Sequence, residues 1–153
     1  MTRWLTATEQ KHWRAWLTAN ALLAEQLQRE LQETHGLSMA DYEILVRLSE
    51  APDRRLRMSE LAHQALSSRS RLSHQISRME ALDLVSRQPC ADDKRGQWAV
   101  LTDHGWDALV AAAPDHVEGV RTHLLDPLST TEFAALGRAC AKVAQHLQDL
   151  EDG

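Results

Sequence analysis

The chain has 153 residues, of which 43% are hydrophobic and 25% charged, and its net charge is −5. These values are typical of a globular protein with a buried core and argue against disorder. No apolar run approaches the ~20 residues that span a bilayer, and the first residues lack the pattern of a signal peptide, so we expect a cytoplasmic protein without membrane contact.

The charge is unevenly distributed along the chain. Residues 54–95 hold nine Arg or Lys and five Asp or Glu, a net charge of +4. The rest of the chain holds 8 basic and 17 acidic residues, a net charge of −9. An acidic chain with a basic centre suggests a local surface that binds a polyanion, flanked by regions that limit nonspecific binding.

The first part of the chain predicts two helices. Apolar residues three and four positions apart indicate a long amphipathic helix over residues 8–34, ended by His35-Gly36. A second helix is predicted from Ser38, its N-cap, to about Glu50, with Asp41 closing a capping box.

The next segment predicts two further helices separated by a tight turn. After a break at residues 51–53, a short extended piece at 56–58 precedes a third helix over residues 59–65. A tight turn at 66–67 leads to Ser68, the N-cap of a fourth helix. The residues expected to form its buried stripe are Leu72, Ile76, Met79 and Leu82.

The opposite face of the fourth helix is polar and lacks acidic residues before Glu80. It carries Arg69, Ser70, Arg71, Ser73, His74, Ser77 and Arg78. A solvated helix face usually mixes both signs of charge, which this face does not. Asp83 lies where the helix must turn out, a position that favours left-handed backbone geometry.

A change of period after the fourth helix predicts a β-hairpin. The two strands are expected at residues 84–88 and 97–101, and residues 90–96 form a loop with a charged tip. Within the tip, Asp93 can hold Arg95 extended. Two more helices follow, one over residues 103–125 capped by Thr102 and a last one that begins with the capping box Ser129/Glu132. The last helix carries the apolar residues Phe133, Leu136, Cys140, Val143, Leu147 and Leu150.

This order of elements predicts a mainly α protein with a small β-hairpin wing, a winged helix-turn-helix. Residues 37–102 would form the DNA-binding lobe, and the long terminal helices of residues 1–36 and 103–153 a dimerisation region. The expected major-groove residues are Ser68, Arg69, Ser70, Arg71, Ser73, His74 and Arg78. Arg71 and His74 could reach base edges, and Arg69 and Arg78 could neutralise phosphates. A hairpin tip with Asp93, Lys94 and Arg95 suits the narrow minor groove beside the recognition helix.

At these residues the sequence resembles the MarR family of transcription regulators, over nearly the whole chain. The similar stretches are residues 58–62, 68–74, 84–87, 100–102 and above all Asp92-Asp93-Lys94-Arg95-Gly96. The resemblance implies a homodimer that binds a palindromic operator, often as a repressor, with Asp93 and Arg95 as the family's wing motif and Arg95 in the minor groove. The chain departs from the family at Asp83, where relatives usually have Gly.

The terminal helices give an independent argument for a dimer. The helix with Trp13 and Trp16 and the last helix each carry more apolar surface than a small lobe can cover, so a second copy is expected to bury it. Two-fold symmetry would place the recognition helices ~34 Å apart, which predicts an inverted-repeat DNA site.

The resemblance also implies a small aromatic or phenolic effector, bound between the dimer layer and the DNA-binding lobe. Trp13, Arg14, Trp16 and Tyr42 could line such a pocket, and the alternative is that the two Trp belong to the dimer core. Cys90, near the wing, could couple oxidation to DNA release, or it is an ordinary strand residue.

Other functions find little support in the sequence. His116 and His123 lie two helical turns apart, but no Cys or acid completes a ligand set, so no metal or other cofactor is expected. The chain contains none of the usual catalytic or nucleotide-binding motifs, which argues against an enzyme. A winged-helix module that binds protein rather than DNA remains as the alternative, although such surfaces usually expose apolar anchors.

Overall fold

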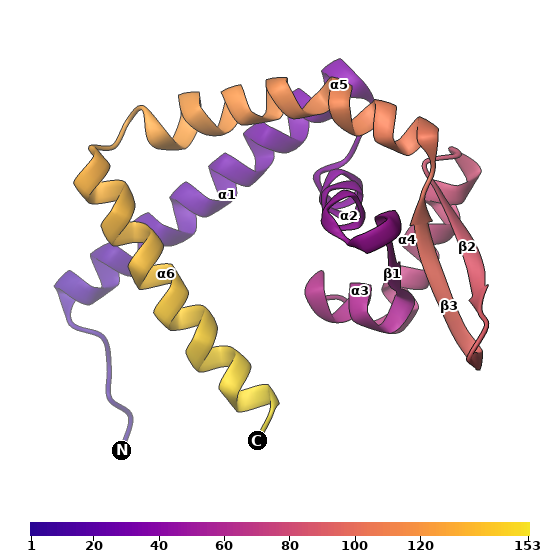
Figure 1. Ribbon diagram of the computed structural model, residues 1–153. Coiled ribbons are helices and arrows are strands. Elements are labelled where there is room, and N and C mark those ends of the chain that lie inside the picture. Colours follow the sequence, from indigo (N-terminus) through magenta and orange to yellow (C-terminus); the bar gives the residue numbers. More distant parts are fainter. The chain divides into compact units, whose positions relative to one another are not determined.

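The computed structural model describes residues 1–153 and shows a mainly helical chain with one three-stranded antiparallel sheet (Figure 1). The elements are α1 (Ala7–His35), α2 (Met39–Glu50), η1 (Pro52–Arg54), β1 (Arg55–Arg57), α3 (Met58–Gln64), α4 (Arg69–Ala81), β2 (Val85–Cys90), β3 (Asp93–Leu101), α5 (Asp103–Val120), η2 (Arg121–Leu125) and α6 (Thr130–Glu151). The predicted fold class, a winged helix-turn-helix with long terminal helices, is confirmed. None of the helices is both long and apolar enough to cross a membrane.

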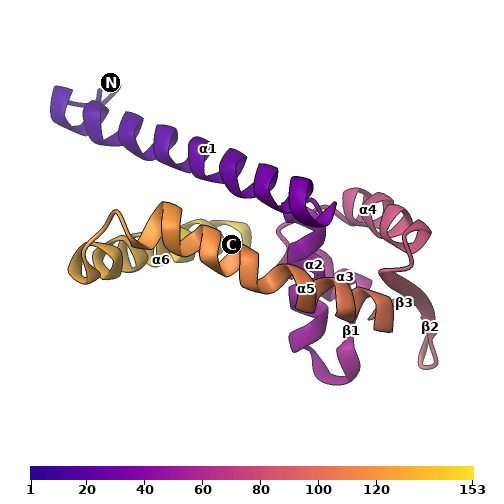
Figure 2. The same cartoon turned by 90° about the horizontal axis from the view of Figure 1, so that it is seen from above.

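The chain forms two compact units. One is Glu25–His116, and the other combines Met1–Ala24 with Val117–Gly153. α1 is a single continuous helix that contributes to both units (Figure 2). The division expected from the sequence, 37–102 for DNA binding and the flanking regions for dimerisation, concerns which surfaces bind partners and stays a prediction.

The core of the unit Glu25–His116 is built from the apolar stripes of its helices and one face of the sheet. Its fully buried side chains include Ile44, Leu45, Leu48, Leu61, Leu72, Ile76, Met79 and Val85. The prediction that Leu82 belongs to this stripe is wrong, because its side chain is 57% exposed. Leu82 is the C-cap of α4, and the chain turns at Asp83 (φ +57°), so the helical period no longer applies there. Gln75 is the polar residue that is buried instead.

The helix caps follow the sequence, with one difference. The Ser129 hydroxyl accepts from the backbone N–H of Glu132, and the Glu132 carboxylate accepts from the Ser129 N–H, which is the complete predicted box. Ser38 accepts from the Asp41 N–H, but the predicted return bond is replaced. The Asp41 carboxylate instead accepts from Gln75 Nε2 at 3.1 Å, because a buried amide needs a partner.

The sheet is larger than the predicted hairpin. β1 pairs with β3, with Arg57 opposite Trp98, so the strand order is β1-β3-β2. The segment expected to be a loop at residues 90–96 is mostly strand, since Cys90 pairs with Asp93 after an irregularity at Pro89. Figure 1 shows β2 and β3 as a long ribbon whose tip projects beyond the helices of this unit. This ribbon is the wing.

The unit formed by the two chain ends leaves much apolar surface uncovered. No residue of α6 is buried, and α1 exposes two large aromatic rings, Trp13 and Trp16, on its N-terminal half. The exposed apolar side chains of this unit include Trp4, Trp13, Trp16, Leu17, Phe133, Val143, Leu147 and Leu150. Amphipathic helices of this kind normally bury such a face against another element.

His116, at the end of the unit Glu25–His116, has an unusual environment. Its ring lies against that of Tyr42, with centroids 4.6 Å apart, and its Nδ1 is buried without a hydrogen-bond partner. Burial lowers the pKa of His116, and the nearby Glu30 carboxylate raises it by a smaller amount.

This depressed pKa predicts a loss of stability at low pH. The unfolded chain takes up a proton near pH 6.5, whereas folded His116 resists protonation, so the free energy of unfolding should fall as the pH drops below that value. Urea denaturation at several pH values would measure it. The free energy of unfolding of His116→Gln should fall less steeply with decreasing pH than that of the wild type. Parallel curves for His116→Gln and the wild type would contradict the prediction.

Candidate nucleic-acid interface

The helix-turn-helix is formed by α3 and α4. The turn between them passes through Leu66, which has a positive φ of 52°, and Ser68 then caps α4 by accepting from the Arg71 N–H at 3.1 Å. All side chains of the predicted polar face are exposed, namely Arg69, Ser70, Arg71, Ser73, His74, Ser77 and Arg78. α4 therefore presents one continuous face of basic, imidazole and hydroxyl groups.

Arg87 of β2 fastens this helix to the wing. Its Nη2 donates to the carbonyl and the hydroxyl of Ser73, at 2.7 and 3.0 Å. Its Nη1 donates to the Ser77 hydroxyl at 3.0 Å and to the Glu80 carboxylate at 2.8 Å. One guanidinium thus binds two successive turns of α4, which fixes the helix relative to β2.

The Arg87 contacts also change what two predicted residues can offer to DNA. The Ser77 hydroxyl donates its hydrogen to the Ser73 carbonyl, so it has no hydrogen left to donate to DNA. The Ser73 oxygen accepts from Arg87, which leaves its hydrogen for an outside acceptor. This role of Arg87 is not predicted by the sequence.

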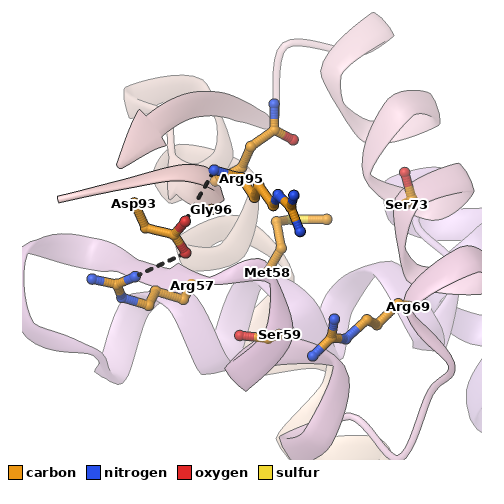
Figure 3. Close-up of a pocket in the computed structure, with 9 residues that line it drawn as sticks. Arg57, Met58, Ser59, Arg69, Ser73, Asp93, Arg95 and Gly96 are labelled. Carbon is orange, nitrogen blue, oxygen red and sulfur yellow. Dashed lines mark hydrogen bonds and ion pairs between the residues drawn. The ribbon is translucent and has the colours of Figure 1, made fainter. Parts of the chain in front are cut away.

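The wing tip is held by the carboxylate of Asp93. Its Oδ1 accepts from the backbone N–H of Arg95 at 3.0 Å, so Asp93 fixes the backbone rather than the guanidinium (Figure 3). A Cβ at Gly96 would lie 2.7 Å from Asp93 Oδ2 and 3.1 Å from Cys90 Sγ, so any other residue there would displace the Asp93 carboxylate. The Arg95 side chain takes part in no ion pair and is exposed.

A hollow of about 310 Å³ lies between the recognition helix and the wing. Arg69 from α4 and Arg95 from β3 extend toward it from different sides, and Ser59 also lines it, beside Arg69 (Figure 3). Neither guanidinium is paired with an acid. Two free cations beside hydroxyl groups can bind an anion such as a backbone phosphate.

Four of the nine basic residues between positions 54 and 95 make ion pairs or cation–π contacts with other side chains of the protein. Arg54 lies 3.8 Å from the ring centre of Trp106, and Arg55 lies 4.3 Å from that of Trp98. Arg57 pairs with Asp92, and Arg87 with Glu80. The basic residues of this segment with neither an ion pair nor a cation–π contact are Arg69, Arg71, Arg78, Lys94 and Arg95, all on α4 or the wing. The cations that remain available to an outside ligand are therefore concentrated on the surface that the sequence predicts to contact DNA.

The residues proposed to line a ligand pocket lie in different units. Trp13 and Arg14 border an open hollow of about 470 Å³ on the unit of the chain ends, together with Trp4. Trp16 is 44% exposed and is not among the residues that line this hollow. Tyr42 is buried against His116 in the unit Glu25–His116, where burial raises the pKa of its phenol. The four-residue pocket stays a prediction.

The two cysteines are free thiols. Cys90 is buried at the base of the wing tip, and Cys140 is partly buried. Burial limits the access of oxidants to Cys90, which favours the ordinary strand residue over the sensor. The structure contains no group of three or more His, Cys, Asp or Glu side chains that could hold a metal ion.

Replacement of Arg87 should destabilise the protein. Arg87→Met removes the guanidinium hydrogen bonds to Ser73, Ser77 and Glu80, so the free energy of unfolding should fall by about 1–3 kcal/mol. Arg78→Met is the matched control, since Arg78 is an unpaired, exposed residue of α4 and its loss should cost less than about 0.5 kcal/mol. Equal denaturation midpoints for the two variants would show that the Arg87 contacts contribute nothing.

Comparison with known proteins identifies the family. Residues 35–96 match the family model described as "MarR family". AbsC, a MarR family transcriptional regulator from Streptomyces coelicolor, is 50% identical with a TM-score of 0.93, over 97% of this chain and 99% of AbsC. Sco3205, a MarR family transcriptional regulator from the same organism solved in complex with DNA, is 46% identical with a TM-score of 0.94, over 97% of this chain and 92% of its own.

A more distant protein shares the fold alone. The organohalide-sensing transcriptional regulator RdhR-CbdbA1625, in its 2,4-dichlorophenol-bound form, is 19% identical with a TM-score of 0.81, over 92% of this chain and 82% of its own. The fold, the exposed basic face of α4 and the near-complete alignment with AbsC and Sco3205 together show that the chain belongs to the MarR family of transcriptional regulators.

Proposed function

We propose that the protein is a homodimeric repressor that binds an inverted-repeat operator, with α4 in the major groove and the wing in the adjacent minor groove. The observation that carries this proposal is that the cations without an ion pair or a cation–π contact between positions 54 and 95 all lie on α4 and the wing. The other four basic residues of this segment contact acidic or aromatic side chains of the protein. A surface built this way offers its charge to an outside polyanion rather than to the protein.

The side chains of the interface suit different parts of DNA. Arg71 and His74 lie on the exposed face of α4 and can donate to base edges in the major groove. Arg69 and Arg78 can neutralise phosphates. The short side chains of Ser68, Ser70 and Ser73 allow the helix to approach closely, and Lys94 and Arg95 extend from the wing tip.

The exposed apolar faces of α1 and α6 support a homodimer. Trp13, Trp16 and Leu147 are each 44–54% exposed in the single chain, and a second copy would remove them from water. A two-fold axis would then present two copies of α4, one DNA turn of ~34 Å apart. Such a dimer, bound over a promoter in the cytoplasm, would repress by excluding RNA polymerase.

An effector is proposed for the hollow beside Trp13 and Arg14. An indole ring next to a guanidinium suits a small aromatic anion, which could stack on the ring and pair with the cation. Binding there would alter the dimer and with it the spacing of the two recognition helices. Titration with salicylate-like compounds that leaves Trp fluorescence and DNA affinity unchanged would count against it.

The experiment that tests the main proposal is selection of DNA sites from a random pool by the purified protein. We expect an inverted repeat with half-sites about one turn apart. Affinity for the selected site should fall with salt, and five unpaired cations per protomer predict a log–log slope no steeper than about −9 for a dimer. If no sequence is recovered and the protein binds DNA only weakly, the result would favour a module that binds protein instead of DNA.

The roles of individual side chains can be separated by comparing operator with random DNA. Arg71→Ala and His74→Ala should each cost about 1–3 kcal/mol on the operator and relax the preference for one base. Arg95→Ala should weaken binding to both DNAs more uniformly. Equal losses on operator and random DNA for all three variants would contradict this division of roles.

A further inference from the structure

The wing tip carries two acids in the region that the proposed function assigns to DNA. Asp92 and Asp93 have side chains that are 75% and 50% exposed, and they immediately precede Lys94 and Arg95. Uncompensated carboxylates at this place would repel the phosphates on both sides of the minor groove. A tip of this composition therefore needs a counter-ion before it can enter the groove.

Arg57 provides the matching charge from another strand. Its Nη2 donates to both carboxylate oxygens of Asp92, at 3.0 and 2.9 Å, and its Nη1 lies 3.9 Å from Asp93 Oδ2. The guanidinium also lies 5.1 Å from the ring centre of Trp98, the residue opposite it on β3. Figure 3 shows Arg57 turned to the Asp93 carboxylate and away from Arg69.

The position of Arg57 in the chain gives this contact a second effect. Arg57 is the last residue of β1 and the N-cap of α3, the first helix of the helix-turn-helix. Its contacts with Asp92 and Asp93 therefore connect the wing tip to the start of α3. Asp93 in turn fixes the backbone of Arg95, so the chain of contacts runs from α3 to the minor-groove residue.

We propose that Arg57 is a positioning residue and counter-ion of the wing, which neutralises Asp92, offsets part of the charge of Asp93 and orients Arg95, and that it does not itself contact a phosphate. The inference rests on the proposed function. An exposed ion pair of this kind contributes little to folding stability. Its effect is expected in DNA affinity instead.

Arg55 is a matched control within the same strand. It stacks on the same Trp98 ring at 4.3 Å but pairs with no carboxylate. Arg55→Gln and Arg57→Gln therefore each remove one positive charge that lies over the same ring. Only Arg57→Gln leaves the wing acids without a cationic partner.

The test is a double-mutant cycle on the selected operator, with Arg57→Gln, Asp92→Asn and the double variant. Arg57→Gln should weaken binding about tenfold, and Asp92→Asn should bind at least as tightly as the wild type. The double variant should return to within about threefold of the wild type, with an unchanged salt slope. Asp92→Asn should not rescue Arg55→Gln, and thermal unfolding should show every variant folded.

Two results would overturn the inference. If Arg57→Gln weakens binding equally with and without Asp92→Asn, and lowers the salt slope by about 0.9 per protomer, Arg57 is a phosphate ligand. If Arg57→Gln does not change the affinity for the operator, Arg57 has no part in DNA binding. A wild-type protein that binds no DNA would instead overturn the proposed function and this inference with it.

Discussion

The contacts of the Arg87 guanidinium determine the geometry of the unit Glu25–His116, because they join α4 to β2. Arg87 bonds to the backbone and the side chains of α4 at Ser73, Ser77 and Glu80 while its own backbone is part of β2. A helix held only by apolar contacts can slide or rotate by small amounts on its core, since such contacts are not directional. Directional bonds from one rigid, planar group remove that freedom, so recognition helix and wing can face DNA as one rigid surface.

Much of the fold could be predicted because its signals are local. The helices are predicted by the spacing of their apolar residues and by N-cap residues such as Ser68 and Ser129, whose hydrogen-bond partners are three residues away. The left-handed turn at Asp83 was also expected, and its carbonyl accepts from Thr102, the predicted cap of α5. The polar face of α4 was identified correctly as exposed, since a one-residue error in helical phase would have placed an apolar residue there.

The contacts that organise the site could not be predicted, because they join residues distant in the sequence. Their polarity alone predicts that Arg57 and Arg87 lie on a surface. It does not predict that Arg57 is hydrogen-bonded to Asp92, which follows it by 35 residues in the sequence. The extent of β3 was missed for a related reason. The charged residues of the tip resemble a loop, and only the pairing with β2 shows them to be strand.

The distribution of charged residues along the chain also affects how the protein approaches DNA. Residues outside 54–95 carry a net charge of −9, while Arg69, Arg71, Arg78, Lys94 and Arg95 lie on α4 and the wing. A duplex attracts these cations and repels acidic groups, so its field exerts an orienting torque on the protein before any contact forms. The protein would therefore approach with its basic face turned forward, which raises the fraction of productive collisions. Dissolved salt would weaken that torque and slow the association itself, independently of the stability of the finished complex.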